Sequence, residues 1–181
     1  ANYEKRKGHE FALQIMKYLN NIDSNIKLLI FGDDSNYENL IYKNKITYLI
    51  SKFNLENNVI LNSFTNNVDN ILSQTEIIIS TSQEYESFGY SILEGMSCGI
   101  PSVVTNVGGL PEVTKDNYNG FVIKNYDYKD FAKKILILIN DKSIYSKFST
   151  NSFNRFKSNF SVNKMINSYI NIIESWLIVY V

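Results

Sequence analysis

The sequence of 181 residues predicts an α/β fold, in which a Rossmann-like parallel sheet carries helices on both faces and the C-terminal end is helical. Two patterns support this prediction. Short apolar runs alternate with segments of helical spacing as far as Ile123, which is typical of βαβ units. From Tyr128 onward the spacing is helical alone.

In the first half of the chain, a helix is expected at 10–19, where apolar residues recur every three or four positions. A buried strand at 26–31 follows and ends in Gly32-Asp33-Asp34-Ser35, which is a turn sequence. The next expected elements are a helix at 40–53, a strand at 59–61, a short helix at 68–72 and a strand at 76–81.

In the second half, a helix is expected after Phe88 and a strand at 102–105. A turn then leads into a further helical start, and a strand is expected at 121–123. Helices are expected at 128–139, 143–157 and 162–177, and the last has an apolar stripe that should pack against another surface. Ligands of parallel sheets bind beyond the carboxyl ends of the strands, so the loops after Phe31, Leu61, Thr81 and Thr105 should hold the site.

Composition indicates one globular domain over 1–181, with 44% hydrophobic residues and no internal repeat or linker. Charges are balanced at 18 basic and 18 acidic residues, so no broad field would attract nucleic acid or an anionic membrane surface. The single cysteine, Cys98, excludes an internal disulfide and fits a reducing compartment. No signal peptide or membrane-spanning stretch is recognisable.

The most informative segment is Glu86-Ser-Phe-Gly-Tyr-Ser-Ile-Leu-Glu94, in which seven residues separate two carboxylates. An expected strand ends just before this segment, and a helix begins within it. Unpaired N–H groups and the helix dipole favour anions at such a helix start. The segment is therefore a candidate site for phosphates and sugars.

This segment resembles the Glu-x7-Glu motif of the retaining nucleotide-sugar glycosyltransferases of family 4 (group 1 glycosyltransferases), which adopt the GT-B fold. Further pieces match in order: Lys7-Gly8, Gly32-Asp33, Gly108-Gly109-x-x-Glu112 and Asn119-Gly120. The resemblance covers nearly the whole chain but only the C-terminal, donor-binding half of such an enzyme. It implies that residues 1–181 are one nucleotide-sugar (donor) binding domain, a fragment of a longer two-domain enzyme. The acceptor-binding half and the first strand of this domain would precede Ala1.

The resemblance also implies roles for individual residues. Glu86 would be catalytic, holding hydroxyls of the transferred sugar and supporting positive charge as the anomeric bond breaks. Glu94 would accept hydrogen bonds from the ribose hydroxyls, and Lys7 would neutralise the β-phosphate. Backbone N–H groups offered to the sugar or the diphosphate would be those of Ser87, Phe88 and Gly89.

Weaker candidates surround these residues, namely Gly8, Arg6, Gly32, Phe64, Gly108, Gly109 and Glu112. Gly108 and Gly109 are expected to serve backbone geometry first, and Glu112 to complement a helix dipole rather than to touch ligand. Many family members carry a second phosphate-binding arginine, and here its places hold Ala1 and Asn2. Whether Arg6 or Asn2 substitutes stays open.

Two single residues are interpreted as structural. The only histidine, His9, is expected on a helix surface, because the family's proposed catalytic histidine belongs to the other half. Cys98 is expected to be a small buried packing residue.

The resemblance implies retaining transfer of a hexose-type sugar from a nucleoside diphosphate sugar, in surface polysaccharide or glycolipid biosynthesis. No metal or other cofactor is expected, and no nucleic-acid partner. The fragment alone should bind donor without turnover, because catalysis needs both halves to close. The expected location is cytoplasmic, with peripheral association at the inner face of the membrane as a further option. Two alternatives stay open, namely a non-catalytic GT-B-like binding or regulatory module and, fitting less well, a GT-B sugar-nucleotide epimerase.

Overall fold

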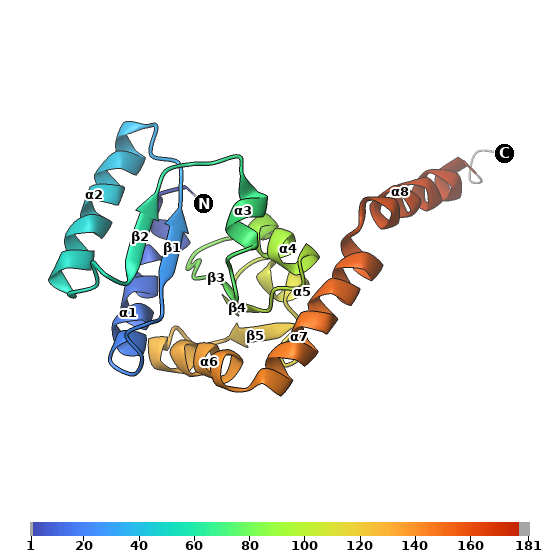
Figure 1. The fold of residues 1–181 in the computed structure, drawn as a ribbon. Coiled ribbons are helices and arrows are strands. Elements are labelled where there is room, and N and C mark those ends of the chain that lie inside the picture. The colour runs from blue at the N-terminus through green and yellow to red at the C-terminus, as the bar shows by residue number, and fades with distance from the viewer. Residues whose placement is uncertain (1, 178–181) are drawn as a thin grey trace.

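The computed structural model describes residues 2–177, in which strands and helices alternate before a helical C-terminal end (Figure 1). The elements are η1 Lys5–Lys7, α1 His9–Asn20, β1 Leu28–Phe31, α2 Tyr37–Lys52, β2 Val59–Asn62, α3 Val68–Leu72, β3 Ile78–Ser80, α4 Tyr90–Ser97, β4 Ser102–Thr105, α5 Leu110–Val113, β5 Gly120–Ile123, α6 Tyr128–Asn140, α7 Lys142–Arg155, η2 Phe156–Phe160 and α8 Val162–Leu177.

All strand pairs are parallel, which confirms the predicted fold class. Among the described residues the strands form two sheets, one with the order β1-β2 and one with the order β3-β4-β5. Within residues 2–177, β1 and β3 are not paired with each other. Both sheets point their carboxyl ends toward the loops in which the sequence places the candidate site.

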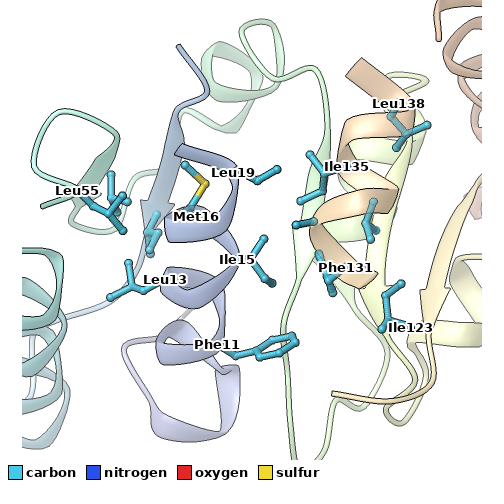
Figure 2. Close-up of a cluster of buried hydrophobic side chains, with 14 of the residues drawn as sticks. Phe11, Leu13, Ile15, Met16, Leu19, Leu55, Ile123, Phe131, Ile135 and Leu138 are labelled. Carbon is cyan, nitrogen blue, oxygen red and sulfur yellow. The ribbon is translucent and has the colours of Figure 1, made fainter. Parts of the chain in front are cut away.

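The main hydrophobic core lies between α1 and its neighbours. Side chains of α1, such as Phe11 and Ile15, face Phe131 and Ile135 of α6 across the centre of this cluster (Figure 2). The rings of Phe11 and Phe131 meet edge to face, with their centroids 5.9 Å apart. A second cluster joins α4 and α5 to β4 around Ile92, and so supports the segment between the two motif carboxylates.

Most expected boundaries agree with the structure, and the exceptions have local causes. Helix α2 begins at Tyr37 rather than at residue 40, because the Asn36 side chain caps it by accepting the Asn39 N–H at 2.8 Å. Helix α7 ends at Arg155, and the chain continues through the π-helical turn η2. Strands β1 and β3 are shorter than their apolar runs.

Helix α8 extends away from the body of the molecule (Figure 1). Its apolar stripe is exposed within residues 2–177, with Tyr169 at 62% and Trp176 at 69% of full accessibility. No surface that packs against this stripe is found in the part of the chain that the structure describes. A helix with so strong an apolar face is stable only when another surface covers that face.

Two single-residue expectations are wrong. His9 is buried, because Tyr3 stacks on its ring at 5.5 Å and Tyr42 meets it edge-on at 5.7 Å. Burial lowers the pKa of His9 from its ordinary 6.5 to about 4. Cys98 is exposed, because it follows the last residue of α4, where the chain turns at the surface.

Candidate functional site

Lys7 ends the short helix η1 and is held at the carboxyl end of β3 by backbone contacts. The Thr81 hydroxyl donates to the Lys7 carbonyl at 3.0 Å, and the Gln83 N–H donates to the Arg6 carbonyl at 2.9 Å. The next residue, Gly8, has φ +71°, and a Cβ there would lie 1.9 Å from the Thr81 carbonyl oxygen. Only glycine lets the backbone pass this closely to the residue that follows β3. This close approach determines the position of the neighbouring Lys7 backbone, and so of its side chain.

Glu86 meets Lys7 directly. Lys7 Nζ donates to Glu86 Oε2 at 2.5 Å, and both side chains are less than one-fifth exposed. The Ser82 hydroxyl donates to the same carboxylate oxygen at 3.2 Å. The Ser82 carbonyl in turn accepts a hydrogen bond from the Thr105 hydroxyl at 2.6 Å. This bond connects the loop after β3 to the last residue of β4, next to the ion pair.

The loop that carries Glu86 rests on the two glycines after β4. The Gly109 N–H donates to the Glu86 carbonyl at 2.9 Å. Gly108 has φ +52°, and a Cβ there would lie 2.0 Å from the same carbonyl oxygen. A Cβ on Gly109 would lie 2.7 Å from the Ser87 carbonyl oxygen. The two glycines therefore determine how closely the loop that carries Glu86 packs on the turn after β4. This agrees with the expectation that they serve backbone geometry first.

Glu94 lies on α4, one turn after Ser91, and both line the same cavity as Lys7 and Glu86. The Glu94 side chain is exposed. Helix α4 begins directly after the 87–89 loop, and the first N–H groups of a helix have no acceptor within it. The cavity is lined by Glu86, Ser91 and Glu94, whereas Ser87, Phe88 and Gly89 do not line it.

The cavity has a volume of about 890 Å³ and runs along the length of β1 and β3, reaching the loop after the carboxyl end of β3. It brings together four of the residues chosen from the sequence, namely Lys7, Phe64, Glu86 and Glu94. Residues that the sequence reasoning missed are Thr81, Ser82 and Ser91, which also line it. The available signal was their position, since Thr81 and Ser82 follow an apolar strand and Ser91 precedes Glu94 by three residues.

Among the weaker candidates, Phe64 lines the cavity and Gly32 does not. Gly32 follows β1 and donates its N–H to the Asn62 carbonyl at 3.2 Å. Phe64, in the loop after β2, exposes 67% of its surface. Glu112 is in the first turn of α5, where its carboxylate complements the helix dipole, and it does not line the cavity.

The Arg6 side chain contacts Glu4 and Tyr85, whereas Lys7 contacts Glu86. Its Nε donates to Glu4 Oε2 at 2.5 Å, and its guanidinium lies 4.7 Å from the centre of the Tyr85 ring. Asn2 donates to the other oxygen of the same carboxylate, Glu4 Oε1, at 2.8 Å. Burial raises the pKa of Glu4, but the bonds from Asn2 and Arg6 outweigh it, so the pKa lies below its ordinary value. Both residues that could replace the second phosphate-binding arginine are therefore engaged with Glu4.

A polar cluster stabilises the loops after β1 and β2, close to Phe64. Lys43 Nζ donates to Asp34 Oδ2 at 2.5 Å, and the Ser63 hydroxyl donates to the same oxygen at 3.0 Å. The Tyr3 hydroxyl donates to the Asn62 carbonyl at 2.8 Å. Burial, reinforced by Asp34, raises the pKa of Tyr3 to about 12, so this phenol stays protonated and keeps donating.

Within residues 2–177, no group of three or more histidine, cysteine, aspartate or glutamate side chains is arranged to bind a metal ion. None of the helices described is both long and apolar enough to cross a bilayer.

The family model described as "Glycosyl transferases group 1" matches residues 1–155. The poly(ribitol-phosphate) alpha-N-acetylglucosaminyltransferase of Staphylococcus aureus is 28% identical over 167 residues, which are 92% of this chain and 32% of that enzyme. The poly(glycerol-phosphate) alpha-glucosyltransferase of Bacillus subtilis is 34% identical over 153 residues, which are 83% of this chain and 20% of that enzyme.

The fold also matches solved structures. A variant of S. aureus TarM, crystallised with fondaparinux, alpha-GlcNAc-glycerol and UDP, superposes with a TM-score of 0.85 at 27% identity. The match covers 94% of this chain and 34% of TarM. In each of these three comparisons the chain spans about a third of the relative or less.

Proposed function

This chain belongs to the group 1 glycosyltransferases, and we propose that it is the donor-binding domain of a longer enzyme. That enzyme would transfer a hexose-type sugar from a nucleoside diphosphate sugar to an acceptor, with retention of anomeric configuration. The observation that carries the proposal is the meeting of Lys7, Glu86 and Glu94 at one cavity, at the carboxyl ends of parallel strands. A UDP complex of the similar enzyme TarM supports a nucleotide-sugar donor.

Each of the three side chains has a distinct task in this proposal. Glu94 accepts hydrogen bonds from the ribose hydroxyls, which a carboxylate does well because it accepts at two oxygens. The Lys7 ammonium neutralises the diphosphate, whose negative charge grows as the sugar leaves. Glu86 holds the sugar hydroxyls and supports positive charge at the anomeric carbon. The N–H groups at the 87–89 loop and the start of α4 add further donors to the anionic end.

Donor binding changes the partners of Lys7. Lys7 Nζ contacts Glu86 Oε2 at 2.5 Å, so the charge of the ammonium is compensated by the carboxylate. A phosphate that reaches Lys7 competes with Glu86 for the same ammonium, and Ser82 still donates to the carboxylate. Binding therefore frees one oxygen lone pair of Glu86 for the sugar at the moment when Lys7 turns to the phosphate.

We further propose that this domain binds donor but does not turn over alone, because transfer needs an acceptor-binding half to close over the donor. The exposed stripe of α8, which includes Ile166, Tyr169 and Trp176, is a surface that such a half would cover. The similar enzymes named for poly(ribitol-phosphate) and poly(glycerol-phosphate) suggest an acceptor in surface polysaccharide biosynthesis. We also propose that the full-length protein is cytoplasmic or is peripheral at the inner face of the membrane.

The test is calorimetric titration of the 181-residue chain with UDP, GDP, ADP and their common sugar conjugates, without added metal and again with EDTA. Selective binding of one nucleotide, unchanged by EDTA, is the expected result. Binding that disappears with EDTA would contradict the metal-independent site. If no nucleotide binds, the donor-domain proposal fails for this chain.

A second candidate function is a binding or regulatory module without transfer activity. It is favoured by one observation, since Arg6 and Asn2 are engaged with Glu4 and leave Lys7 as the cation that contacts Glu86 among residues 2–177. Transfer by the full-length protein to any acceptor separates the two functions. Release of a free, epimerised sugar nucleotide without acceptor would instead indicate an epimerase.

A further inference from the structure

The π-helical turn η2, which connects α7 to α8, lies against the loop that follows Glu86. The ring of Phe160, the last residue of η2, meets the Phe88 ring edge to face, with the centroids 5.9 Å apart. Both side chains are partly buried and pack against the hydrophobic cluster around Ile92. Single π-helical turns are rare in proteins, and those that occur often lie at functional sites. The ring contact is therefore a candidate link between η2 and the site.

The Phe88 side chain attaches the 87–89 loop to the domain. Among residues 2–177, no hydrogen bond to the backbone N–H or C=O groups of Ser87 and Phe88 is found. The chain is held before this point, where the Glu86 carbonyl accepts the Gly109 N–H at 2.9 Å, and after it, where Gly89 precedes α4. Between these two points, the position of the backbone depends on the packing of the Phe88 ring.

Arg155 holds the Phe160 ring in place. Its guanidinium lies 5.5 Å from the centre of that ring, which is a cation–π contact. The same group donates from Nη2 to the Glu112 carbonyl at 2.6 Å and from Nε to the Val113 carbonyl at 3.1 Å. These are the last carbonyls of α5, which have no partner within that helix. Arg155 therefore joins η2 to α5, which begins directly after Gly109.

Two chains of contacts thus lead from η2 to the loop that carries Glu86. The first is the direct contact of Phe160 with Phe88, two residues after Glu86. The second runs from Arg155 through α5 to Gly109, whose N–H donates to the Glu86 carbonyl. Both end on the backbone that places the Glu86 carboxylate at the cavity.

We propose that Phe160 is a positioning residue for Glu86, because it holds Phe88 and with it the backbone between Glu86 and α4. Arg155 orients Phe160 for this task. Phe160 does not line the cavity, so it acts through the loop and not on a ligand. Its importance for donor binding rests on the function proposed above, whereas its effect on the loop is independent of any ligand.

The first test follows the loop without ligand. Phe160→Ala is compared with Phe156→Ala, which removes the same side chain from the same turn and the same cluster but no ring contact with Phe88 among the described residues. Amide hydrogen exchange of the Gly109 N–H is measured by NMR, with the Leu110 N–H, hydrogen-bonded within the same turn, as the internal reference. We expect exchange at Gly109 to be at least tenfold faster in Phe160→Ala than in Phe156→Ala, without such a difference at Leu110.

The second test follows ligand binding by calorimetry. UDP-glucose is expected to bind at least fivefold more weakly to Phe160→Ala than to Phe156→Ala, because its sugar and diphosphate meet the loop. UMP, which lacks the sugar and the β-phosphate, should bind both variants equally. Phe160→Tyr keeps the ring, and its hydroxyl can reach water because Phe160 is partly exposed. This variant should therefore match the unchanged chain in both tests.

Equal exchange at Gly109 in the two alanine variants would overturn the proposal. An equal increase at Leu110 would also overturn it, because the whole turn would then be loosened. Faster exchange at Gly109 with unchanged affinity for UDP-glucose would overturn the role in donor binding. If the unchanged chain binds neither ligand, the function proposed above fails, and exchange at Gly109 still decides whether Phe160 holds the loop. If Phe160→Ala does not fold, Phe160→Leu, which keeps an apolar side chain without the ring, is measured in its place.

Discussion

Lys7 Nζ lies 2.5 Å from Glu86 Oε2, although 79 positions separate the two residues in the sequence. Both side chains are less than one-fifth exposed, so water screens the pair only partly. The proposed donor needs both groups, the ammonium for its phosphate and the carboxylate for its sugar. In the proposed function, the donor would break this ion pair and bind each of the two charges.

The strength of this ion pair can be measured by a double-mutant cycle. Lys7→Met and Glu86→Gln are made singly and together, and the free energy of unfolding is obtained from urea denaturation. We expect a coupling energy of about 1–2 kcal/mol, because each single variant leaves a largely buried charge without its partner. Additive effects, within about 0.3 kcal/mol, would show that the pair contributes nothing to the folded state.

Replacing Lys7 should affect phosphate recognition selectively. We expect Lys7→Ala to weaken binding of a nucleoside diphosphate far more than binding of the nucleoside, because only the former meets the ammonium. Lys5→Ala removes the same charge from the same short helix at a position that does not line the cavity, and should change neither affinity. Equal losses for both ligands in the Lys7 variant would remove this residue from the phosphate site.

Glu94 should contribute to binding of the ribose. Glu94→Ala is expected to weaken nucleotide binding roughly tenfold or more, from the loss of about 1.5–3 kcal/mol of charge-assisted hydrogen bonding. Calorimetry gives the affinity, and Glu84→Ala is the control, since Glu84 is an exposed acid nearby that does not line the cavity. A Glu94 variant with unchanged affinity would contradict the ribose assignment.

Gly108 should be essential for the position of Glu86. In Gly108→Ala, the new Cβ would lie 2.0 Å from the Glu86 carbonyl oxygen, so the carboxylate loop must move. Gly99→Ala is matched in its positive φ of +73°, but its Cβ would lie 3.3 Å from a side-chain oxygen and meets no such backbone contact. We expect about 1–2 kcal/mol of destabilisation for Gly99→Ala, and a larger loss plus weaker nucleotide-sugar binding for Gly108→Ala. Equal losses of stability and unchanged binding would contradict this role of Gly108.

His9 should make stability depend on pH. Burial lowers its pKa to about 4, so the folded protein binds this proton more weakly than the unfolded chain, whose value is about 6.5. Stability from this residue is therefore complete above pH 6.5 and falls by about 3 kcal/mol as the pH decreases to about 4. NMR titration of the single imidazole reports the pKa, and in His9→Gln the loss of stability over this window should be smaller by that amount. A measured pKa near 6.5 would contradict the burial of His9.

Local pattern predicted the individual elements well, because hydrophobic spacing and turn residues act over a few neighbours. The bounds of α3, β4 and α8 were obtained from the sequence without error. The start of α2 was missed because a side-chain cap at Asn36 extended the helix beyond its apolar pattern. The strand order within each sheet could not be predicted, because strand pairing depends on contacts between distant segments.

The sequence by itself determined the α/β class, the order of the elements and the carboxylate motif, because these depend on residue type and short-range spacing. Tertiary structure alone decided which residues meet. It placed Lys7 and Ser82 within hydrogen-bond distance of the Glu86 carboxylate. It also buried His9 between two tyrosines and paired Arg6 with Glu4. The physical reason is that each of these contacts depends on where separate loops converge at the ends of the strands, and that convergence follows from the packing of the whole domain.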